Sequence, residues 1–146
     1  MAALLGDPDV MTYYPAPKTR DQALQWIDWN LDNYAQYGHG LWIIENADGE
    51  FVGDCGLTIQ RPMGEPEVEV GYHVRTKFQR RGLASEAAVA CREAARRAGV
   101  QHLIAIIHPD NLASQGVARR IGLSPERQTD LDSSTGVRLM IFGADL

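Results

Sequence analysis

The sequence has little cysteine and no long hydrophobic run. Of its 146 residues only Cys55 and Cys91 are cysteines, and they lie far apart without a surrounding motif. Such sparse cysteine argues against a disulfide scaffold and favours free, buried thiols in a reducing cytoplasm, while a disulfide between the two stays open. We find no signal peptide and no apolar run long enough to span a membrane. We therefore expect a cytoplasmic protein without a membrane partner.

Positive charge and metal-binding patterns are also scarce. The net charge is −5, which argues against general nucleic-acid binding and mildly favours cationic partners such as amines. The four histidines are His39, His73, His102 and His108, and they show no metal-ligand spacing. The sequence therefore predicts no metal site.

The chain also lacks repeats, low-complexity segments and linkers, so we expect one domain over residues 1–146. Its N-terminal segment is rich in turn formers. A helix follows, because Thr19 and Gln22 form a capping-box pattern and Gly38 ends the apolar helical spacing. The pattern then predicts strands at 41–45, 51–60 and 67–75, helix 82–98, strand 102–107, helix 112–121 and a hairpin around 134–136. This order is typical of an α/β (α+β) domain with a mixed, mostly antiparallel sheet.

The stretch "QRRGLA", residues 79–84, joins a predicted strand to a predicted helix. The first N–H groups of a helix have no internal partner, and the helix dipole adds positive potential there. Gly82 allows close approach to the backbone, and Arg80 and Arg81 add charge. These features suit a phosphate or pyrophosphate. The loop is neither a Walker loop nor a dinucleotide fingerprint, and an exposed basic turn is the alternative.

In its context, "QRRGLA" resembles the Gln/Arg-x-x-Gly-x-Gly/Ala motif of the GCN5-related N-acetyltransferases, the GNAT family. "EVEVGYHV" upstream is similar to the family's central strand, and "HPDNLASQGVARRIGL" downstream to its Asn-x-x-Ser helix. The resemblance covers roughly residues 4–142 and is strongest to the RimJ/RimL-type branch, which acetylates protein N-termini and sometimes small amines. It implies a GNAT-like sheet with a central splayed pair of parallel strands, flanked by helices.

The family's usual first strand is missing from this pattern. We therefore expect "LWIIE", residues 41–45, near an exposed sheet edge, where dimerisation or low solubility is plausible.

The resemblance also implies a set of site residues for acetyl-CoA, the co-substrate. The backbone near Tyr72, His73 and Val74 would hold the pantetheine arm, and Asn111 would contact its amides. The pyrophosphate would lie on the backbone of the loop formed by Gln79, Arg80, Arg81, Gly82, Leu83 and Ala84.

Two residues are candidates for catalysis by the same resemblance. Glu69 occupies the family's acidic position and would take the amine proton, directly or through water. Glu67 shares its strand face, and a second carboxylate nearby can raise a pKa. Ser114 matches the serine that would donate a hydrogen bond to the leaving thiolate. The alternatives are exposed or substrate-binding carboxylates for the glutamates, and local helix hydrogen bonding for Ser114.

Aromatic residues fall where the family builds its acceptor cleft: Tyr13, Tyr14, Trp26 and Trp29. Aromatics on a helix are more often core residues, and a lone strand histidine such as His73 is usually structural. The leading interpretation is an N-acetyltransferase that moves an acetyl group to a primary amine by direct attack in a ternary complex. A non-catalytic CoA-binding or sensor module and an N-terminally truncated inactive fragment are the alternatives.

Overall fold

The computed structural model describes residues 1–146, folded around one mixed six-stranded sheet of order β1-β2-β3-β4-β6-β5. All neighbouring strands are antiparallel except β3 and β4, which are parallel. The predicted mixed, mostly antiparallel fold is confirmed. The strands are β1 (Leu41–Glu45), β2 (Phe51–Gln60), β3 (Glu67–Val74), β4 (His102–Ile107), β5 (Ser124–Gln128) and β6 (Met140–Asp145). The helices are α1 (Ala2–Leu5), α2 (Arg20–Tyr37), α3 (Leu83–Arg97) and α4 (Leu112–Arg120), with the 3-10 turn η1 (Thr76–Phe78).

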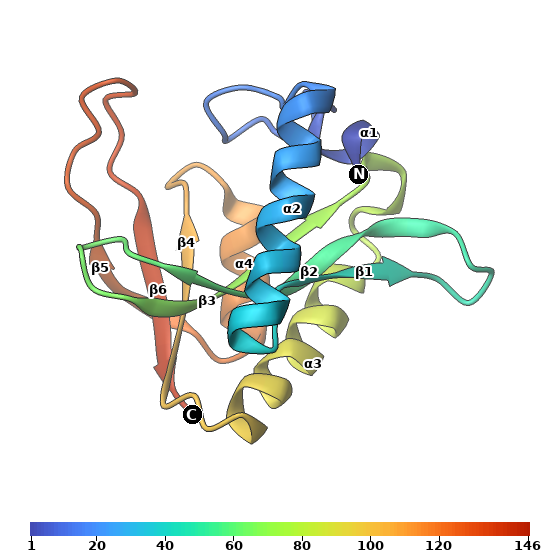
Figure 1. Ribbon diagram of the computed structural model, residues 1–146. Coiled ribbons are helices and arrows are strands. Elements are labelled where there is room, and N and C mark those ends of the chain that lie inside the picture. The colour runs from blue at the N-terminus through green and yellow to red at the C-terminus, as the bar shows by residue number, and fades with distance from the viewer.

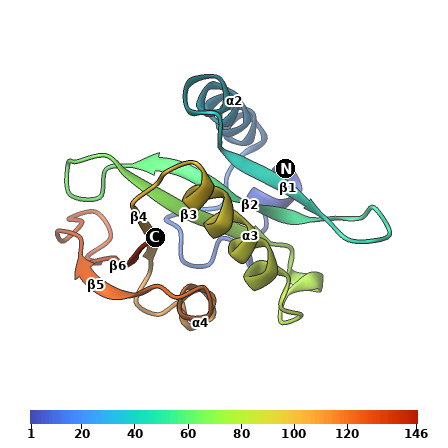
Figure 2. The ribbon, with the colours of Figure 1, turned by 90° about the horizontal axis from the view of Figure 1, so that it is seen from below.

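The helices cover both faces of the sheet. Helix α2 crosses one face, while α3 and α4 lie together on the other (Figure 1 and Figure 2). Helix α1 and the loop after it lie at the same end of the sheet as the β3–α3 turn (Figure 1). No helix is both long and apolar enough to cross a membrane.

Local chemistry sets the ends of the helices as predicted. The Thr19 hydroxyl accepts from the Gln22 N–H while the Gln22 side chain accepts from the Thr19 N–H, which completes the capping box of α2. Gly38 ends that helix in the left-handed conformation, with φ of 75°. The short helix α1 was not expected, because its segment is rich in turn formers; it is anchored by the buried side chains of Leu4 and Leu5.

The parallel pair at the centre of the sheet is short. Strands β3 and β4 are paired only at Val68 with Leu103 and at Glu69 with Ile104. Beyond Glu69, β3 continues along β2 as far as Val74, and β4 continues along β6 as far as Ile107. The two strands therefore splay apart towards their C-terminal ends, as the GNAT resemblance implied.

Helix α3 packs closely on the sheet through small side chains. Ala88, Cys91 and Ala95 are buried within the main core cluster. Cys91 lies against Cys55 of β2, with 3.5 Å between the sulfur atoms, and both thiols are free and buried. This packing holds α3 in place so that its N-terminus lies beside the splayed strands.

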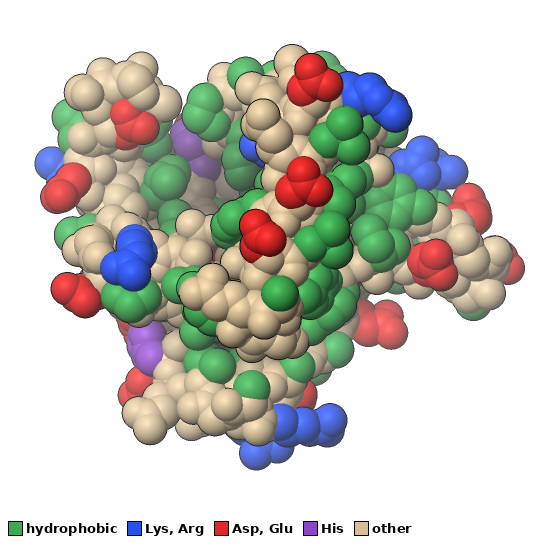
Figure 3. All heavy atoms as spheres, viewed as in Figure 1, with side chains coloured by type: hydrophobic (Ala, Val, Ile, Leu, Met, Phe, Trp, Pro, Cys, Tyr) green, Lys and Arg blue, Asp and Glu red, His purple; other side chains and the backbone are tan.

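The apolar spacing of α2 does not mark its buried face. Leu24 and Leu31 are 49% and 58% exposed, and hydrophobic side chains gather along this helix in Figure 3. The buried face carries Asn30, whose side chain accepts from the Leu41 N–H and donates to the Trp26 carbonyl. Helix α2 therefore docks on the sheet by satisfying backbone groups at the start of β1.

Strand β1 is an edge strand, as predicted. It pairs only with β2, and its Trp42 and Ile43 side chains are exposed. An unpaired strand edge can recruit another strand. Pairing of two copies along this edge stays a prediction.

Candidate active site

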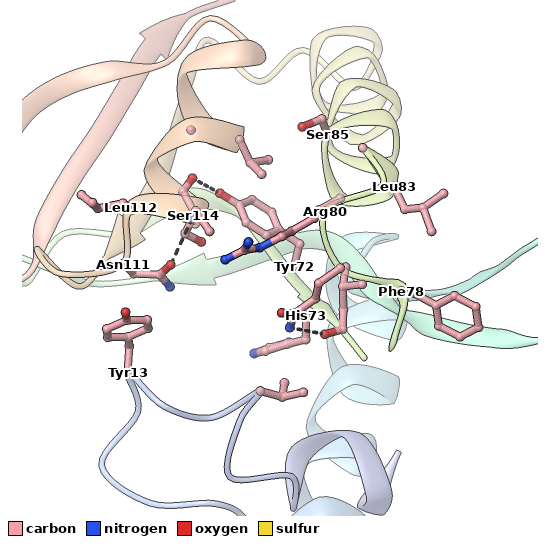
Figure 4. Close-up of a pocket in the computed structure, with 18 of the residues that line it drawn as sticks. Tyr13, Tyr72, His73, Phe78, Arg80, Leu83, Ser85, Asn111, Leu112 and Ser114 are labelled. Carbon is pink, nitrogen blue, oxygen red and sulfur yellow. Dashed lines mark hydrogen bonds between the residues drawn. The ribbon is translucent and has the colours of Figure 1, made fainter. Parts of the chain in front are cut away.

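A cavity of about 700 Å³ lies between the splayed strands, the loop after α1 and the N-termini of α3 and α4. It brings together ten of the twelve residues predicted to bind acetyl-CoA or, like Glu69 and Ser114, to act in catalysis, and Figure 4 shows how several of them face one another. These ten are Tyr72, His73, Val74, Gln79, Arg80, Gly82, Leu83, Ala84, Asn111 and Ser114. Glu69 and Arg81 are not among its lining residues.

The loop before α3 forms a backbone anion cradle. Arg80 and Gly82 both have left-handed backbones, with φ of 62° and 77°, and no side chain caps the helix at Gly82. The backbone N–H groups from Arg80 to Ser85 find no acceptor in the protein, since the first helical bond is donated by Glu86 to the Gly82 carbonyl. Consecutive free N–H groups in such a turn bind anions.

Side-chain charge at the cradle differs in part from expectation. Arg80 lines the cavity, together with Arg120 from the end of α4. Arg81 instead lies over the ring of Phe78, with 5.8 Å from its guanidinium carbon to the ring centroid. The Arg81 side chain is therefore not placed in the cavity.

The cavity passes through the gap in the sheet. Tyr72 and His73 are neighbours on β3, so their side chains point to opposite faces, yet both line the cavity. The space on the α3 and α4 side is thus continuous with the space on the α2 side. A long ligand on one face can reach a second ligand on the other.

Helix α4 begins at this gap, and Asn111 caps it. The Asn111 side-chain oxygen accepts from the Ser114 N–H at 3.1 Å, which leaves the Asn111 amide nitrogen free to contact a ligand. The Ser114 carbonyl accepts from the Tyr72 hydroxyl at 2.8 Å (Figure 4). Both bonds use the backbone of Ser114, so its hydroxyl makes no hydrogen bond within the protein.

Glu69 lies where the parallel pair begins to splay. One of its carboxyl oxygens lies 3.4 Å from the place where a Cβ on Gly71 would stand, an ordinary contact distance, so the carboxyl lies beside Gly71. Burial raises the pKa of the Glu69 carboxyl to about 7, opposed by a hydrogen bond from the Ile106 backbone and by His73. A carboxyl with a pKa near neutrality is suited to proton transfer.

Glu67 does not contribute to that shift, contrary to expectation. Its carboxylate accepts from the Arg127 guanidinium of β5 at 2.6 Å, an ion pair that neutralises it locally. The causes of the raised Glu69 pKa include no other carboxylate. The prediction failed because the partner of Glu67 comes from a strand sixty residues away in the chain.

The opposite end of the cavity is aromatic. Tyr13 and Tyr14 of the loop after α1 line it, and their rings lie 5.2 Å from His108 and 5.4 Å from His73 between centroids. Trp26 meets the His73 ring edge-on at 6.4 Å, whereas Trp29 is exposed on α2 and does not line the cavity. Tyr13 and Tyr14 therefore line the cavity and Trp26 does not, and an acceptor cleft at this end stays a prediction.

One buried residue beside His73 was not predicted from the sequence. Asp54 is fully buried in β2, and its carboxylate lies 2.8 Å from Nδ1 of His73. The signal was present, since an aspartate in the middle of the otherwise uncharged strand "FVGDCGLTIQ" requires a buried partner.

No group of three or more His, Cys, Asp or Glu side chains is arranged to hold a metal ion.

Comparison with known proteins agrees with this geometry. Residues 1–124 match the model of the acetyltransferase (GNAT) domain family. The uncharacterized protein YkkB of Bacillus subtilis (strain 168) is 40% identical in an alignment of 124 residues that covers 82% of this chain and 71% of the relative.

Two solved structures share the fold. The ribosomal-protein-alanine N-acetyltransferase from Brucella melitensis is similar with a TM-score of 0.80 and 21% identity, over 99% of this chain and 91% of that one. The structure of yncA from Salmonella typhimurium with its cofactor acetyl-CoA is similar with a TM-score of 0.72 and 19% identity, over 90% and 77% of the two chains.

Proposed function

The chain belongs to the GNAT acetyltransferase family, and from this premise we propose that it moves an acetyl group from acetyl-CoA to a primary amine. The observation that carries the proposal is the cavity itself. It joins the free N–H groups of residues 80–85 on one face of the sheet to His73 and the aromatic group on the other. The first end suits a pyrophosphate and the second a small cationic amine.

Different residues would bind the cofactor and assist the reaction. The cradle at residues 80–85 would hold the pyrophosphate, and the splayed edge of β3 from Tyr72 to Val74 would bind the pantetheine arm and polarise the thioester carbonyl. Glu69 would take a proton from the amine, directly or through water, because an ammonium group is not a nucleophile. The amine nitrogen would then attack the thioester carbon directly, in a ternary complex, and Ser114 would donate a hydrogen bond to the departing thiolate.

We further propose that the acceptor is an α-amine at a peptide N-terminus or a small amine, in the manner of the RimJ/RimL-type branch. The Brucella melitensis neighbour, named for ribosomal-protein alanine, supports this class. The acidic net charge of −5 favours a cationic acceptor. We expect the reaction to take place in the cytoplasm.

Two measurements test the function in order. Acetyl-CoA should raise the melting temperature, and CoA should raise it less, because a ligand that binds only the folded chain stabilises it. Thiol release from acetyl-CoA is then followed with peptides that begin with free alanine or serine, with glucosamine and with a polyamine. A thermal shift without turnover on any amine would indicate a CoA-binding module instead, and no shift at millimolar acetyl-CoA would contradict the cofactor assignment.

A further inference from the structure

Asp54 is a charged group in a place where charge is costly. It is fully buried in β2, directly opposite His73 in the register of β2 and β3. Its Oδ1 lies 2.8 Å from His73 Nδ1, while its Oδ2 is buried without a partner. A buried carboxylate needs a strong interaction to persist. The histidine is the only side chain that provides one here.

The second ring nitrogen of His73 continues the contact into the cavity. Nε2 lies 2.8 Å from the hydroxyl oxygen of Tyr14, from the loop between α1 and α2. A carboxylate only accepts hydrogen bonds, so Nδ1 of His73 carries the proton that bonds Asp54. When the ring is neutral, Nε2 is an acceptor and receives the hydrogen bond of the Tyr14 hydroxyl, whose oxygen lies 2.8 Å away. The three groups thus form one directed chain from Tyr14 through His73 to Asp54.

The Tyr14 oxygen is the end of this chain that meets the cavity. Its proton points to His73, and its remaining lone pairs are free to accept from a ligand. The pKa of Tyr14 is raised by burial of its hydroxyl and by the charges of Glu69 and Asp54 and by Tyr72, so it remains a phenol. A neutral hydroxyl can pass a proton on only if it receives one at the same time.

We propose that Asp54, His73 and Tyr14 form a proton relay for the acceptor amine, in which Tyr14 touches the substrate, His73 accepts the proton from Tyr14 and Asp54 positions His73. The inference rests on the proposed function. It assigns a second route for protons beside Glu69.

The chemistry of the reaction requires such a second route. An ammonium group loses one proton to become nucleophilic and a second after its nitrogen has bonded to the acetyl carbon. Glu69 takes the first. In the second transfer the N–H proton moves to the Tyr14 oxygen while the Tyr14 proton moves to His73 Nε2, which leaves an imidazolium beside the Asp54 carboxylate. The oxyanion then re-forms its carbonyl, the carbon–sulfur bond breaks with its electron pair on sulfur, and the thiolate takes the proton back through Tyr14.

The first test removes the hydroxyl of Tyr14. With the amine that the wild-type protein acetylates fastest, Tyr14→Phe should lower kcat about 100-fold, the usual scale of acid–base assistance. The melting-temperature rise caused by acetyl-CoA should not change. Tyr37→Phe is the matched control, because Tyr37 stacks on His39 at 5.9 Å on α2, away from the cavity. Wild-type kcat in Tyr14→Phe would overturn the relay.

The second test reverses the direction of the hydrogen bonds between these three side chains without removing any of them. In Asp54→Asn the side-chain amide can donate to His73 Nδ1, which moves the ring proton to Nε2 and reverses its bond to Tyr14. We expect the same loss of kcat, and no further loss in the double variant with Tyr14→Phe, because both changes interrupt one path. Losses that multiply would show two independent effects and overturn the proposal.

A third measurement separates this inference from the proposed function. The ¹⁵N signals of the His73 ring report its tautomer without any substrate, and they should show Nδ1–H in the wild-type protein and Nε2–H in Asp54→Asn. The Nε2–H form in the wild-type protein would contradict the chain. If no amine of the panel is acetylated, the proposed function fails, and the ring signals still decide whether the chain exists.

Discussion

The Tyr72 hydroxyl on β3 donates a hydrogen bond to the Ser114 carbonyl on α4, across the gap between the splayed strands, with 2.8 Å between the oxygens. Burial raises the pKa of Tyr72 to about 12, so the phenol keeps its proton over the physiological range. The bond fixes the start of α4 relative to β3. It therefore sets the width of the cavity at the point where both ligands would meet.

Tyr72→Phe should widen this gap at a small cost in stability. We expect a loss of about 1 kcal/mol in the free energy of unfolding, the usual contribution of one hydrogen bond, and weaker acetyl-CoA binding. Denaturant unfolding and calorimetric titration measure the two effects. Tyr34→Phe is the control: the Tyr34 hydroxyl donates to the Leu41 carbonyl at 2.6 Å, away from the cavity, so that variant should lose stability alone. Equal affinity in both variants would show that the Tyr72 bond does not shape the site.

Gly82→Glu should abolish acetyl-CoA binding while the fold persists. Gly82 has a positive φ, open space where a Cβ would stand, and a place in the cavity lining, so a carboxylate there would meet the pyrophosphate. Gly99, at the other end of α3, also has a positive φ and open space. Gly99→Glu should therefore carry the same backbone cost, about 1–2 kcal/mol, and keep its affinity. Tight binding by Gly82→Glu would mean that the loop is only a turn.

Ser114→Ala should lower turnover about tenfold and leave acetyl-CoA affinity and melting temperature nearly unchanged. The backbone of Ser114 makes the contacts with Asn111 and Tyr72, and both survive the change. The lost hydroxyl would otherwise donate to a developing thiolate, and a hydrogen bond to a charged group contributes about 1.5–3 kcal/mol. Steady-state kinetics measures the effect, and Ser114→Thr, which keeps the hydroxyl, should recover part of the rate. Full turnover in Ser114→Ala would show that the Ser114 hydroxyl takes no part in catalysis.

Glu69→Gln should remove a step from the pH dependence of the rate. As a base the carboxyl acts when deprotonated, so wild-type kcat/KM should rise as the pH passes through about 7, and the variant should lose that rise. Glu67→Gln, which breaks the exposed pair with Arg127, should keep it. A pH profile of Glu69→Gln identical to that of the wild-type protein would contradict the assignment.

The raised pKa of the Glu69 carboxyl also makes the stability of the protein fall as the pH rises. Because the folded pKa of Glu69 is raised from 4.5 to about 7, the folded chain binds a proton more readily than the unfolded chain between these values. Wild-type stability therefore falls as the pH rises through this interval, by up to about 3 kcal/mol, since one pKa unit corresponds to about 1.4 kcal/mol. Glu69→Gln lacks this loss, so its stability relative to the wild-type protein should be greater at pH 8 than at pH 4.5. Denaturant unfolding at the two pH values measures the difference.

Much of the fold was predictable because its determinants are local. The capping box of Thr19 and Gln22, the left-handed Gly38 and Gly82, and the Asn111 cap each depend on a few consecutive residues. Strand alternation and these end signals placed every main helix and strand. The cradle at residues 80–85 belongs to the same class, since free N–H groups follow from the position of the helix start alone.

The tertiary structure alone decided which groups meet. Leu24 and Leu31 follow helical spacing yet face solvent, whereas Asn30 is buried and accepts from the Leu41 N–H of the edge strand. Glu67 pairs with Arg127, and His73 contacts both Asp54 and Tyr14, at separations of 19 to 60 residues in the chain. Such pairings depend on strand register and on how the loop after α1 folds over the sheet, and no local pattern encodes either. The sequence by itself determined the loop at residues 80–85 and the helix behind it, whereas only the folded chain brought His73, Asp54 and Tyr14 together.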